Sequence, residues 1–411
     1  MSTARPVAVA GAGVISAIGA NVRECLAALE SGHAGMGDIT GLDTVHRGEI
    51  PVAEVKADNN QLAEIAGVSE GTSRTALLSL IAAREALESA AIPELNRWRT
   101  GIVSANTVGG MDRTEAFVSR GLHGGLHGGL RGGLHGRLRE IVQHECGYST
   151  EWVGDRLGLR DYQTTISTAC SSSANAIGFG AKLIRHGILD VVVAGGTDAL
   201  TKFTLNGFNS LMILDRAWCK PFDDERRGLN LGEGAGYLVM VSDAVAATLP
   251  GKVDCVLSGF ANANDAYHQT ASSPDGRGSW LAMKTALERS GLQPADIDYI
   301  NLHGTGTQNN DLAEGTAIRR LFDPRYPKMS STKSFTGHTL GASGGIEAVF
   351  SVLAVRHDLV YPNLRLRTPM PELPFVPVTE LIRDVPIRHV LSNSFGFGGN
   401  CSSLVFSKGQ S

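Results

Sequence analysis

The sequence lacks the features that would carry the chain across a membrane or brace it with disulfide bonds. No stretch approaches the roughly 18 consecutive apolar residues of a spanning helix, and the amino terminus has no charged segment followed by an apolar core. The 6 cysteines are scattered along 411 residues without a paired spacing such as C-x-x-C, which argues against a disulfide framework and a zinc site. We therefore expect a cytoplasmic protein with reduced thiols and no membrane partner.

An excess of positive charge is also missing. Lysine and arginine total 37 against 41 aspartates and glutamates, a formal net charge of -4, so no overall basic field would attract nucleic acid. Any basic docking site must therefore be local. The content of 42% hydrophobic and 19% charged residues is close to the globular average. A chain of this length predicts two domains or one large two-part domain.

Glycine is the residue in excess, at 50 of 411 residues, about 12% where roughly 7% is usual. Part of the excess lies in residues 121–136, a four-residue repeat of glycine, leucine and histidine or arginine. Its histidines could form a metal-binding tract, but glycine at half the positions disfavours the helix that would align them. We interpret this segment as a low-complexity insertion. A second glycine motif, GAGVIS at residues 11–16, has Ser16 where a dinucleotide fingerprint needs its third glycine, so we interpret it as a tight strand-to-helix turn.

Strand-like and helix-like segments alternate along the chain. Such alternation favours parallel-rich sheets covered by helices, and the same rhythm in both halves predicts a duplicated unit with a boundary near residues 245–255. Expected strands are 6–14, 100–104, 191–194, 236–241, 253–257 and 297–302, and expected helices are 72–91, 280–290 and 345–356.

A reactive cysteine is predicted in STACSSSANAIGFGAKLIRHG, residues 167–187. The apolar spacing predicts a helix that begins directly after Cys170. Unpaired N–H groups and the dipole at a helix start favour a thiolate by about 0.3–2 kcal/mol, so we expect the pKa of Cys170 to lie below its ordinary value. Small neighbouring residues leave room for a bulky acyl group. The alternative is a buried structural thiol.

Three later segments each offer a reactive group at the end of an element. NLHGTGTQNND (301–311) presents His303, KSFTGHTLGASGG (333–345) presents Lys333 and His338, and NSFGFGGNC (393–401) presents Phe397 between glycines. Catalytic groups gather on loops that rigid scaffolds hold, and glycines let a backbone N–H approach closely enough to stabilise an oxyanion. We therefore predict one active site built from these segments and Cys170.

TACSSS, HGTGT, KSFTGHTLGASGG and NSFGFGG, in this order, resemble the β-ketoacyl-[acyl carrier protein] synthases of the elongating type. The resemblance implies an α/β thiolase-like fold, with two similar α-β-α halves stacked in five layers. It places Cys170 in a half spanning residues 1–250, with the insertion at 121–136, and His303, Lys333 and His338 in a half spanning 251–411. It also implies two kinds of partner: an acyl carrier protein, and a second subunit, which would be an identical copy or a related chain-length factor.

The same resemblance implies decarboxylative Claisen condensation. Cys170 would take an acyl chain from the phosphopantetheine arm of the carrier, and His303 and His338 would donate hydrogen bonds to the enolate formed from malonyl-carrier protein. Lys333 would orient the site near His338. No metal and no redox cofactor is implied. The backbone N–H groups of Cys170 and Phe397 would form the oxyanion hole, with Phe397 as a gate, and the implied substrate-binding residues are Thr305, Thr307, Gly396 and Gly398.

Other positions are expected to support the site or depart from the family pattern. Glu347 and Asn393 could frame a monovalent cation, as in some relatives, but we interpret them, together with Asp311, as members of a buried hydrogen-bond network. Asn400 and Cys401 replace the usual threonine and asparagine at the end of the NSFGFGG motif. The basic residues available for carrier docking are Arg74, Arg216, Lys220, Arg226 and Arg227.

Residues 195–216, GGTDALTKFTLNGFNSLMILDR, are similar to synthases of bacterial aryl polyene and related pigment pathways, a branch close to type II polyketide synthases. Three alternative functions share the fold. A non-condensing chain-length factor would normally lack the cysteine. A thiolase would carry a second cysteine in a CxG motif, whereas Cys401 precedes Ser402 and Ser403. A priming synthase would use cysteine, histidine and asparagine.

Overall fold

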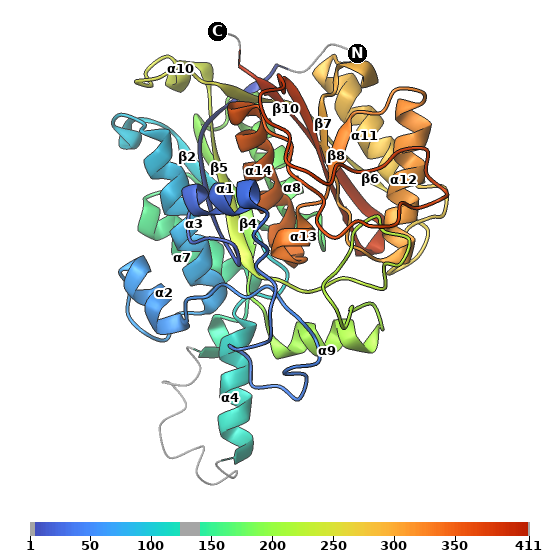
Figure 1. Ribbon diagram of the computed structural model, residues 1–411. Helices are drawn as coiled ribbons and strands as arrows, with labels where there is room; N and C mark the ends of the chain where they lie inside the picture. Colours follow the sequence, from blue (N-terminus) through green and yellow to red (C-terminus); the bar gives the residue numbers. More distant parts are fainter. Residues whose placement is uncertain (1–4, 124–139, 410–411) are drawn as a thin grey trace.

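A computed structural model of the chain describes residues 5–123 and 140–409 (Figure 1). Its strands are β1 (Val7–Ser16), β2 (Thr100–Ala105), β3 (Tyr162–Ile166), β4 (Val191–Asp198), β5 (Gly234–Val241), β6 (Cys255–Asn264), β7 (Tyr299–Asn301), β8 (Lys328–Ser330), β9 (His389–Gly396) and β10 (Asn400–Lys408). Its α-helices are α1 (Val22–Ser31), α2 (Asn59–Ala66), α3 (Arg74–Ala90), α4 (Met111–His123), α7 (Cys146–Leu157), α8 (Ser172–Arg185), α9 (Lys202–Ser210), α10 (Asp243–Ala246), α11 (Arg277–Ser290), α12 (Gln308–Phe322), α13 (Lys333–Thr336) and α14 (Ser343–His357). Short 3₁₀ turns cover Leu95–Arg97, Pro294–Asp296, Leu340–Ala342 and Phe397–Gly399.

The order of the strands reveals a duplication. The described strands join in the order β3-β2-β4-β5-β1-β6-β10-β9-β7-β8. From the centre outward, one half reads 1-5-4-2-3 and the other reads 6-10-9-7-8, which is the same sequence with five added to each number. The halves meet where β1 pairs antiparallel with β6. The expected pair of similar halves is therefore confirmed, while the exact division at residue 250 stays a prediction.

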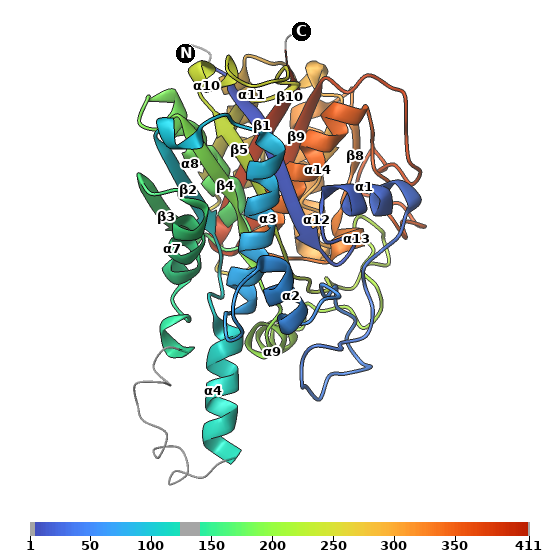
Figure 2. The ribbon, with the colours of Figure 1, turned by 90° about the vertical axis from the view of Figure 1, so that its left-hand side faces the viewer.

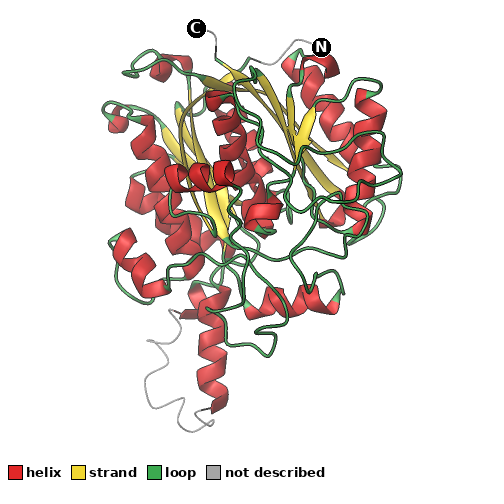
Figure 3. Cartoon of the chain, in the orientation of Figure 1, coloured by secondary structure: helices red, strands yellow, loops and turns green. Residues whose placement is uncertain are grey.

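The helices complete five layers. Helices α3 and α7 cover the outer face of the first half, and α11 and α12 cover that of the second (Figures 1 and 2). Between the halves lie α8 and α14, which contact strands of both (Figure 3). Helix α14 is buried on all sides from Ser343 to Val355, as a helix in a central layer must be. This arrangement confirms the predicted thiolase-like stack.

The glycines of GAGVIS serve packing and not a turn. Gly11 and Gly13 lie inside β1, and a side chain on either would come within 2.2 Å of the carbonyl oxygen of Ala86 or 2.1 Å of that of Ala82 in α3. Helix α3 therefore rests directly on the strand. The expected strand-to-helix turn at this motif is wrong, because β1 continues through Ser16.

The duplication also brings the predicted site segments together. Helix α8 follows β3 in the first half and α14 follows β8 in the second, so the two central helices are equivalent. Cys170 lies just before α8, and His338 lies shortly before α14.

The glycine-rich segment 121–136 lies outside the described residues from position 124 onward. Within residues 5–123 and 140–409, no helix has both the length and the apolar composition needed to cross a bilayer.

Candidate active site

Cys170 lies in a tight turn that leads from β3 into α8. The preceding residue, Ala169, adopts the left-handed conformation with φ of 52°, and the Thr168 N–H donates to Oγ of Ser172 at 2.8 Å. Helix α8 begins at Ser172, one residue after the start that the sequence predicts. Non-glycine residues rarely adopt this conformation, and such strain is characteristic of functional sites. The turn holds the buried Cys170 side chain at the wall of a cavity.

The end of β9 supports this turn from the other side. A side chain on Gly396 would come within 2.9 Å of the Cys170 backbone nitrogen, so only glycine fits there. The next residue, Phe397, directs its backbone N–H at the Cys170 thiol, as does the N–H of Cys170 itself. These are the two donors predicted for the oxyanion hole. Asn400, the departure from the family pattern, donates to the Phe397 carbonyl oxygen at 3.3 Å.

The predicted lowering of the thiol pKa is wrong. Burial raises the pKa of Cys170 to about 11, although the charge of Lys333 and the two backbone N–H groups lower it. The free energy needed to remove a thiolate from water is larger than the stabilisation that the N–H groups at the helix start provide. The resting sulfur is therefore a thiol.

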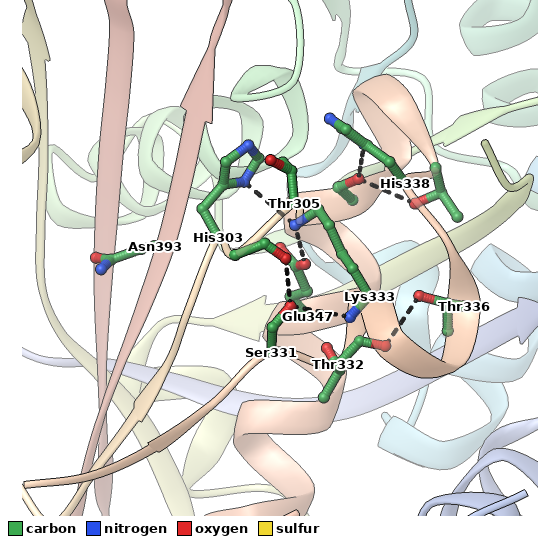
Figure 4. Close-up of polar contacts among 12 residues, drawn as sticks. His303, Thr305, Ser331, Thr332, Lys333, Thr336, His338, Glu347 and Asn393 are labelled. Atoms are coloured by element: carbon green, nitrogen blue, oxygen red, sulfur yellow. Dashed lines mark hydrogen bonds and ion pairs between the residues drawn. The ribbon is translucent and has the colours of Figure 1, made fainter. Parts of the chain in front are cut away.

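His303 follows β7 and contacts Lys333. The Nζ atom of Lys333 lies 3.2 Å from Nδ1 of His303 and also forms a buried ion pair with Glu347 of α14 (Figure 4). An ammonium group can only donate, so Nδ1 accepts and the His303 ring proton lies on Nε2. The direct contact of Lys333 is thus with His303, while its charge also acts on His338, near which the sequence analysis expects it.

His338 has the same tautomer for a different reason. Its Nδ1 accepts the backbone N–H of Leu340 at 3.2 Å and lies 3.0 Å from Oγ of Ser343, which leaves the ring proton on Nε2. The rings of His303 and His338 are 5.4 Å apart and nearly perpendicular. Burial, with the charge of Lys333, lowers the pKa of both imidazoles well below the ordinary value. The site therefore holds two neutral N–H donors.

Two carboxylates of α12 hold the turn that carries His303. Asp311, predicted as structural, accepts the backbone N–H groups of Thr305 and Gly306. Glu314, which the sequence analysis missed, accepts those of His303 and Gly304, both at 2.9 Å, and burial raises its pKa to about 7. The sequence does contain a signal for Glu314, because it lies three residues after Asp311 and acidic residues three apart on a helix share one face.

Glu347 and Asn393 belong to separate hydrogen-bond networks. Asn393 donates to Glu314 at 3.1 Å and accepts from Ser403 at 2.8 Å, on the α12 side of β9. The adjacent Ser394 points to the opposite side, toward α14, where Glu347 pairs with Lys333. Asn393 stands apart from the Glu347 and Lys333 cluster in Figure 4. Each of the two residues is hydrogen-bonded inside the protein, and no hydrogen bond between them is formed.

The reactive groups meet in one cavity of about 500 Å³. Phe397 stacks on Phe208 of α9 at its wall, with ring centroids 5.8 Å apart. Gly398 is outside the lining and donates its N–H to the Gln269 carbonyl oxygen at 2.7 Å. Lys333, Glu347 and Asp311 lie behind the wall. The predicted site residues that line the cavity are Cys170, His303, Thr305, Thr307, His338, Gly396 and Phe397.

Two predicted docking cations are structural instead. Arg74 forms a buried ion pair with Glu233 at 2.6 Å, and its guanidinium also donates to backbone oxygens. Arg226 is buried and donates to the carbonyl oxygens of Thr307 and Gln308. Each guanidinium is thus already engaged by several acceptors inside the protein.

Comparison with known proteins agrees with this geometry. The family models described as "Beta-ketoacyl synthase, N-terminal domain" and "Beta-ketoacyl synthase, C-terminal domain" match residues 4–246 and 254–367. The chain is 33% identical over 418 residues to "3-oxoacyl-[acyl-carrier-protein] synthase 2" of Staphylococcus aureus, covering 99% of each chain. It is 34% identical over 420 residues to the protein of the same name from a Synechocystis species, covering 98% of each.

Two solved structures are similar over almost the whole chain. "The ishigamide ketosynthase/chain length factor" has a TM-score of 0.90 at 28% identity and covers 99% of this chain and 100% of its own. The "Ketosynthase (ApeO) in Complex with its Chain Length Factor (ApeC)" from Xenorhabdus doucetiae has a TM-score of 0.84 at 31% identity and covers 98% of each chain. The chain thus belongs to the beta-ketoacyl synthase family of condensing acyltransferases, in agreement with its four ordered motifs and its thiolase-like fold.

Proposed function

We propose that this protein lengthens an acyl chain by decarboxylative condensation, with Cys170 as the nucleophile and His303 and His338 as the hydrogen-bond donors to the enolate. The observation that carries this assignment is their convergence: one thiol and two neutral imidazoles, each with its proton on Nε2, line a single cavity. A nucleophile, an oxyanion hole and a second pair of donors are the groups that the two half-reactions require.

In the first half-reaction, the Cys170 sulfur attacks the carbonyl carbon of an acyl thioester on the carrier. The backbone N–H groups of Cys170 and Phe397 stabilise the oxyanion, and one donor of this kind is typically worth about 2.7–4 kcal/mol. The carbon–sulfur bond to the pantetheine breaks, and the proton lost by Cys170 goes to the departing pantetheine thiolate. The acyl chain remains on Cys170.

In the second half-reaction, a malonyl thioester enters the same cavity. Breaking its bond to the carboxylate releases carbon dioxide and leaves the electron pair on an enolate, whose oxygen accepts the Nε2–H groups of His303 and His338. The enolate carbon then attacks the acyl group, and the bond to the Cys170 sulfur breaks with its electron pair on sulfur. The thiolate takes up a proton from water, which restores the resting thiol. A protonated histidine would bring a full charge into a buried site, so the lowered pKa of each ring suits this role.

The substrates would arrive on the phosphopantetheine arm of an acyl carrier protein, so the reaction needs no redox cofactor. Thr305 and Thr307, whose hydroxyl oxygens lie 2.9 Å apart at the cavity wall, are placed to bond the amides of the arm. All 6 cysteines are free, which suits the reducing cytoplasm. The partner subunit would be an identical copy or a chain-length factor, as in the ApeO complex. Strand β3 lies at one edge of the sheet, and this unpaired edge is where such a subunit could add its own strand.

The alternative functions fit the site less well. A non-condensing chain-length factor does not need a thiol and two oriented imidazoles in one cavity. A thiolase needs a second cysteine facing the first, but Cys401 lies outside the cavity lining, buried beside Ser279 with the two side-chain atoms 3.8 Å apart.

The test separates the two half-reactions. Incubation with acyl-carrier protein should add one acyl mass to the parent protein and none to Cys170→Ala, while Cys255→Ala, a buried cysteine of β6, should acylate normally. His303→Ala and His338→Ala should still be acylated but should release little carbon dioxide from malonyl-carrier protein. A full adduct on Cys170→Ala, or normal release by both histidine variants, would refute the assignment.

A further inference from the structure

Four of the five basic residues expected at the docking surface already have partners. Arg226 is buried, and the mostly buried Arg74 pairs with Glu233, as described above. On the surface, Arg216 pairs with Glu49 at 3.0 Å and Lys220 pairs with Glu225 at 3.1 Å. Only Arg227 remains.

Arg227 is exposed and lines the cavity that contains Cys170. Within residues 5–123 and 140–409, its guanidinium has no ion-pair or hydrogen-bond partner. Arginine has five N–H donors, and the rest of the cavity wall provides no counter-charge. Among the lining residues of the described chain, Arg227 is the single lysine or arginine, and no aspartate or glutamate is present. The cavity therefore carries one uncompensated positive charge.

Neighbouring contacts fix the position of the Arg227 backbone. The side chain of Arg226 donates to the carbonyl oxygens of Thr307 at 3.3 Å and Gln308 at 3.0 Å. On the other side, the carbonyl oxygen of Gly228 lies so close to Gly306 that a side chain there would come within 2.8 Å of it. The two residues that flank Arg227 thus contact the turn of Thr305 and Thr307, Arg226 through its side chain and Gly228 through its backbone. Arg227 lines the same cavity as the two threonines assigned to the pantetheine amides.

A thioester substrate that reaches Cys170 past Thr305 and Thr307 places its pantetheine in this part of the cavity and its phosphate farther out. The phosphate is the one charged group of the arm, and a guanidinium binds phosphate oxygens through two parallel hydrogen bonds. The other polar lining residues near this turn, Gln308, Asn309 and Asn310, are neutral.

We propose that Arg227 binds the phosphate of the phosphopantetheine arm and so selects phosphorylated pantetheine thioesters. This inference rests on the proposed function, because it assumes that Cys170 is acylated from that arm. An acidic side chain of the carrier protein is the competing occupant, and the experiment below separates the two.

The test compares three acyl donors that share one acyl group: acyl-pantetheine, acyl-4′-phosphopantetheine and acyl-carrier protein. The kcat/KM of Cys170 acylation is measured by intact mass for each donor. The parent should prefer the phosphorylated arm to pantetheine, and Arg227→Gln should reduce that ratio about tenfold or more, as expected for a lost hydrogen bond to a charged group. Arg227→Lys should retain part of the preference for the phosphorylated arm, because lysine keeps the positive charge but cannot form the two parallel hydrogen bonds of a guanidinium. Arg23→Gln, which removes the same charge from an exposed position of α1, should leave the ratio unchanged.

Three results would overturn the proposal. An unchanged ratio in Arg227→Gln would show that the phosphate is bound elsewhere, and a defect confined to acyl-carrier protein would assign Arg227 to an acidic side chain of the carrier. An equal loss with all three donors would indicate a structural role.

Direct titration with free 4′-phosphopantetheine and free pantetheine gives a readout that does not depend on acylation of Cys170. Weaker binding of the phosphorylated compound to Arg227→Gln would support the phosphate contact even if Cys170 proved not to be the nucleophile, and equal binding by parent and variant would refute it.

Discussion

Nζ of Lys333 lies 3.2 Å from Nδ1 of His303 and at the same time pairs with the carboxylate of Glu347. All three side chains are buried, and they come from α13, the turn after β7 and α14. The lysine thus determines which nitrogen of His303 carries the proton without itself lining the cavity. In our account Lys333 is a positioning residue.

Replacing Lys333 should therefore separate decarboxylation from acylation. We expect Lys333→Met to lower carbon dioxide release from malonyl-carrier protein by about 10² or more, the usual range for a lost proton-directing group, while Cys170 is still acylated. The single variant leaves Glu347 buried and unpaired, which typically costs about 3–5 kcal/mol of the free energy of unfolding. Lys333→Met combined with Glu347→Gln should recover stability in a thermal melt but not the lost decarboxylation. Recovery of both would assign Lys333 a purely structural role.

The pH dependence of Cys170 alkylation tests the effect of burial on the thiol. Only the thiolate reacts with iodoacetamide, and burial raises the pKa of Cys170 to about 11. The thiolate fraction, and with it the alkylation rate, should rise about tenfold per pH unit between about pH 7 and pH 9. The rate is followed by mass spectrometry of the Cys170 peptide. A plateau above about pH 8 would mean that the helix start governs the thiol after all.

Glu314 should stabilise both the fold and the site. Glu314→Ala leaves the backbone N–H groups of His303 and Gly304 without their acceptor, and an unsatisfied buried donor typically costs about 1–3 kcal/mol. We expect a lower melting temperature and reduced carbon dioxide release. The control is Glu288→Ala on α11, whose half-exposed side chain should matter little. Equal melting temperatures for the two variants would contradict this role.

Gly396→Ala should disturb the nucleophile turn. The added methyl group would lie 2.9 Å from the Cys170 nitrogen and 3.1 Å from the Thr168 carbonyl oxygen, so the turn must move. We expect acylation of Cys170 to fall at least tenfold, because the oxyanion donors move with it. Gly147→Ala is a matched control, since a methyl group there meets nothing within 4 Å. Acylation by Gly396→Ala at the parent rate would show that the close approach is unimportant.

The sequence predicts the fold well because strand and helix periodicities are local properties. The expected helix at 345–356 matches α14, and the equivalence of the two halves is visible in the alternation of elements. The expected strand at 297–302 is shorter in the structure, because only Tyr299–Asn301 pair with both neighbouring strands. The motifs also located the cysteine and the two histidines that line the cavity, since each stands at the end of an element.

What the sequence could not predict depends on burial and on contacts between distant segments. The start of α8 after Cys170 was visible, but the desolvation that raises the thiol pKa was not. Lys333 is five residues from His338 and 30 from His303, yet it contacts the more distant histidine. From the sequence alone, Arg74 is expected to be a surface cation, because its partner Glu233 lies 159 positions away in the chain.

A crystal structure of the acylated protein tests the central claim most directly. Our account predicts an acyl group bonded to Sγ of Cys170, with its carbonyl oxygen about 2.7–3.1 Å from the backbone nitrogens of Cys170 and Phe397. The thioester should face a space bounded by His303 and His338. An acyl group on another cysteine, or a thioester oxygen directed away from both backbone nitrogens, would contradict the account.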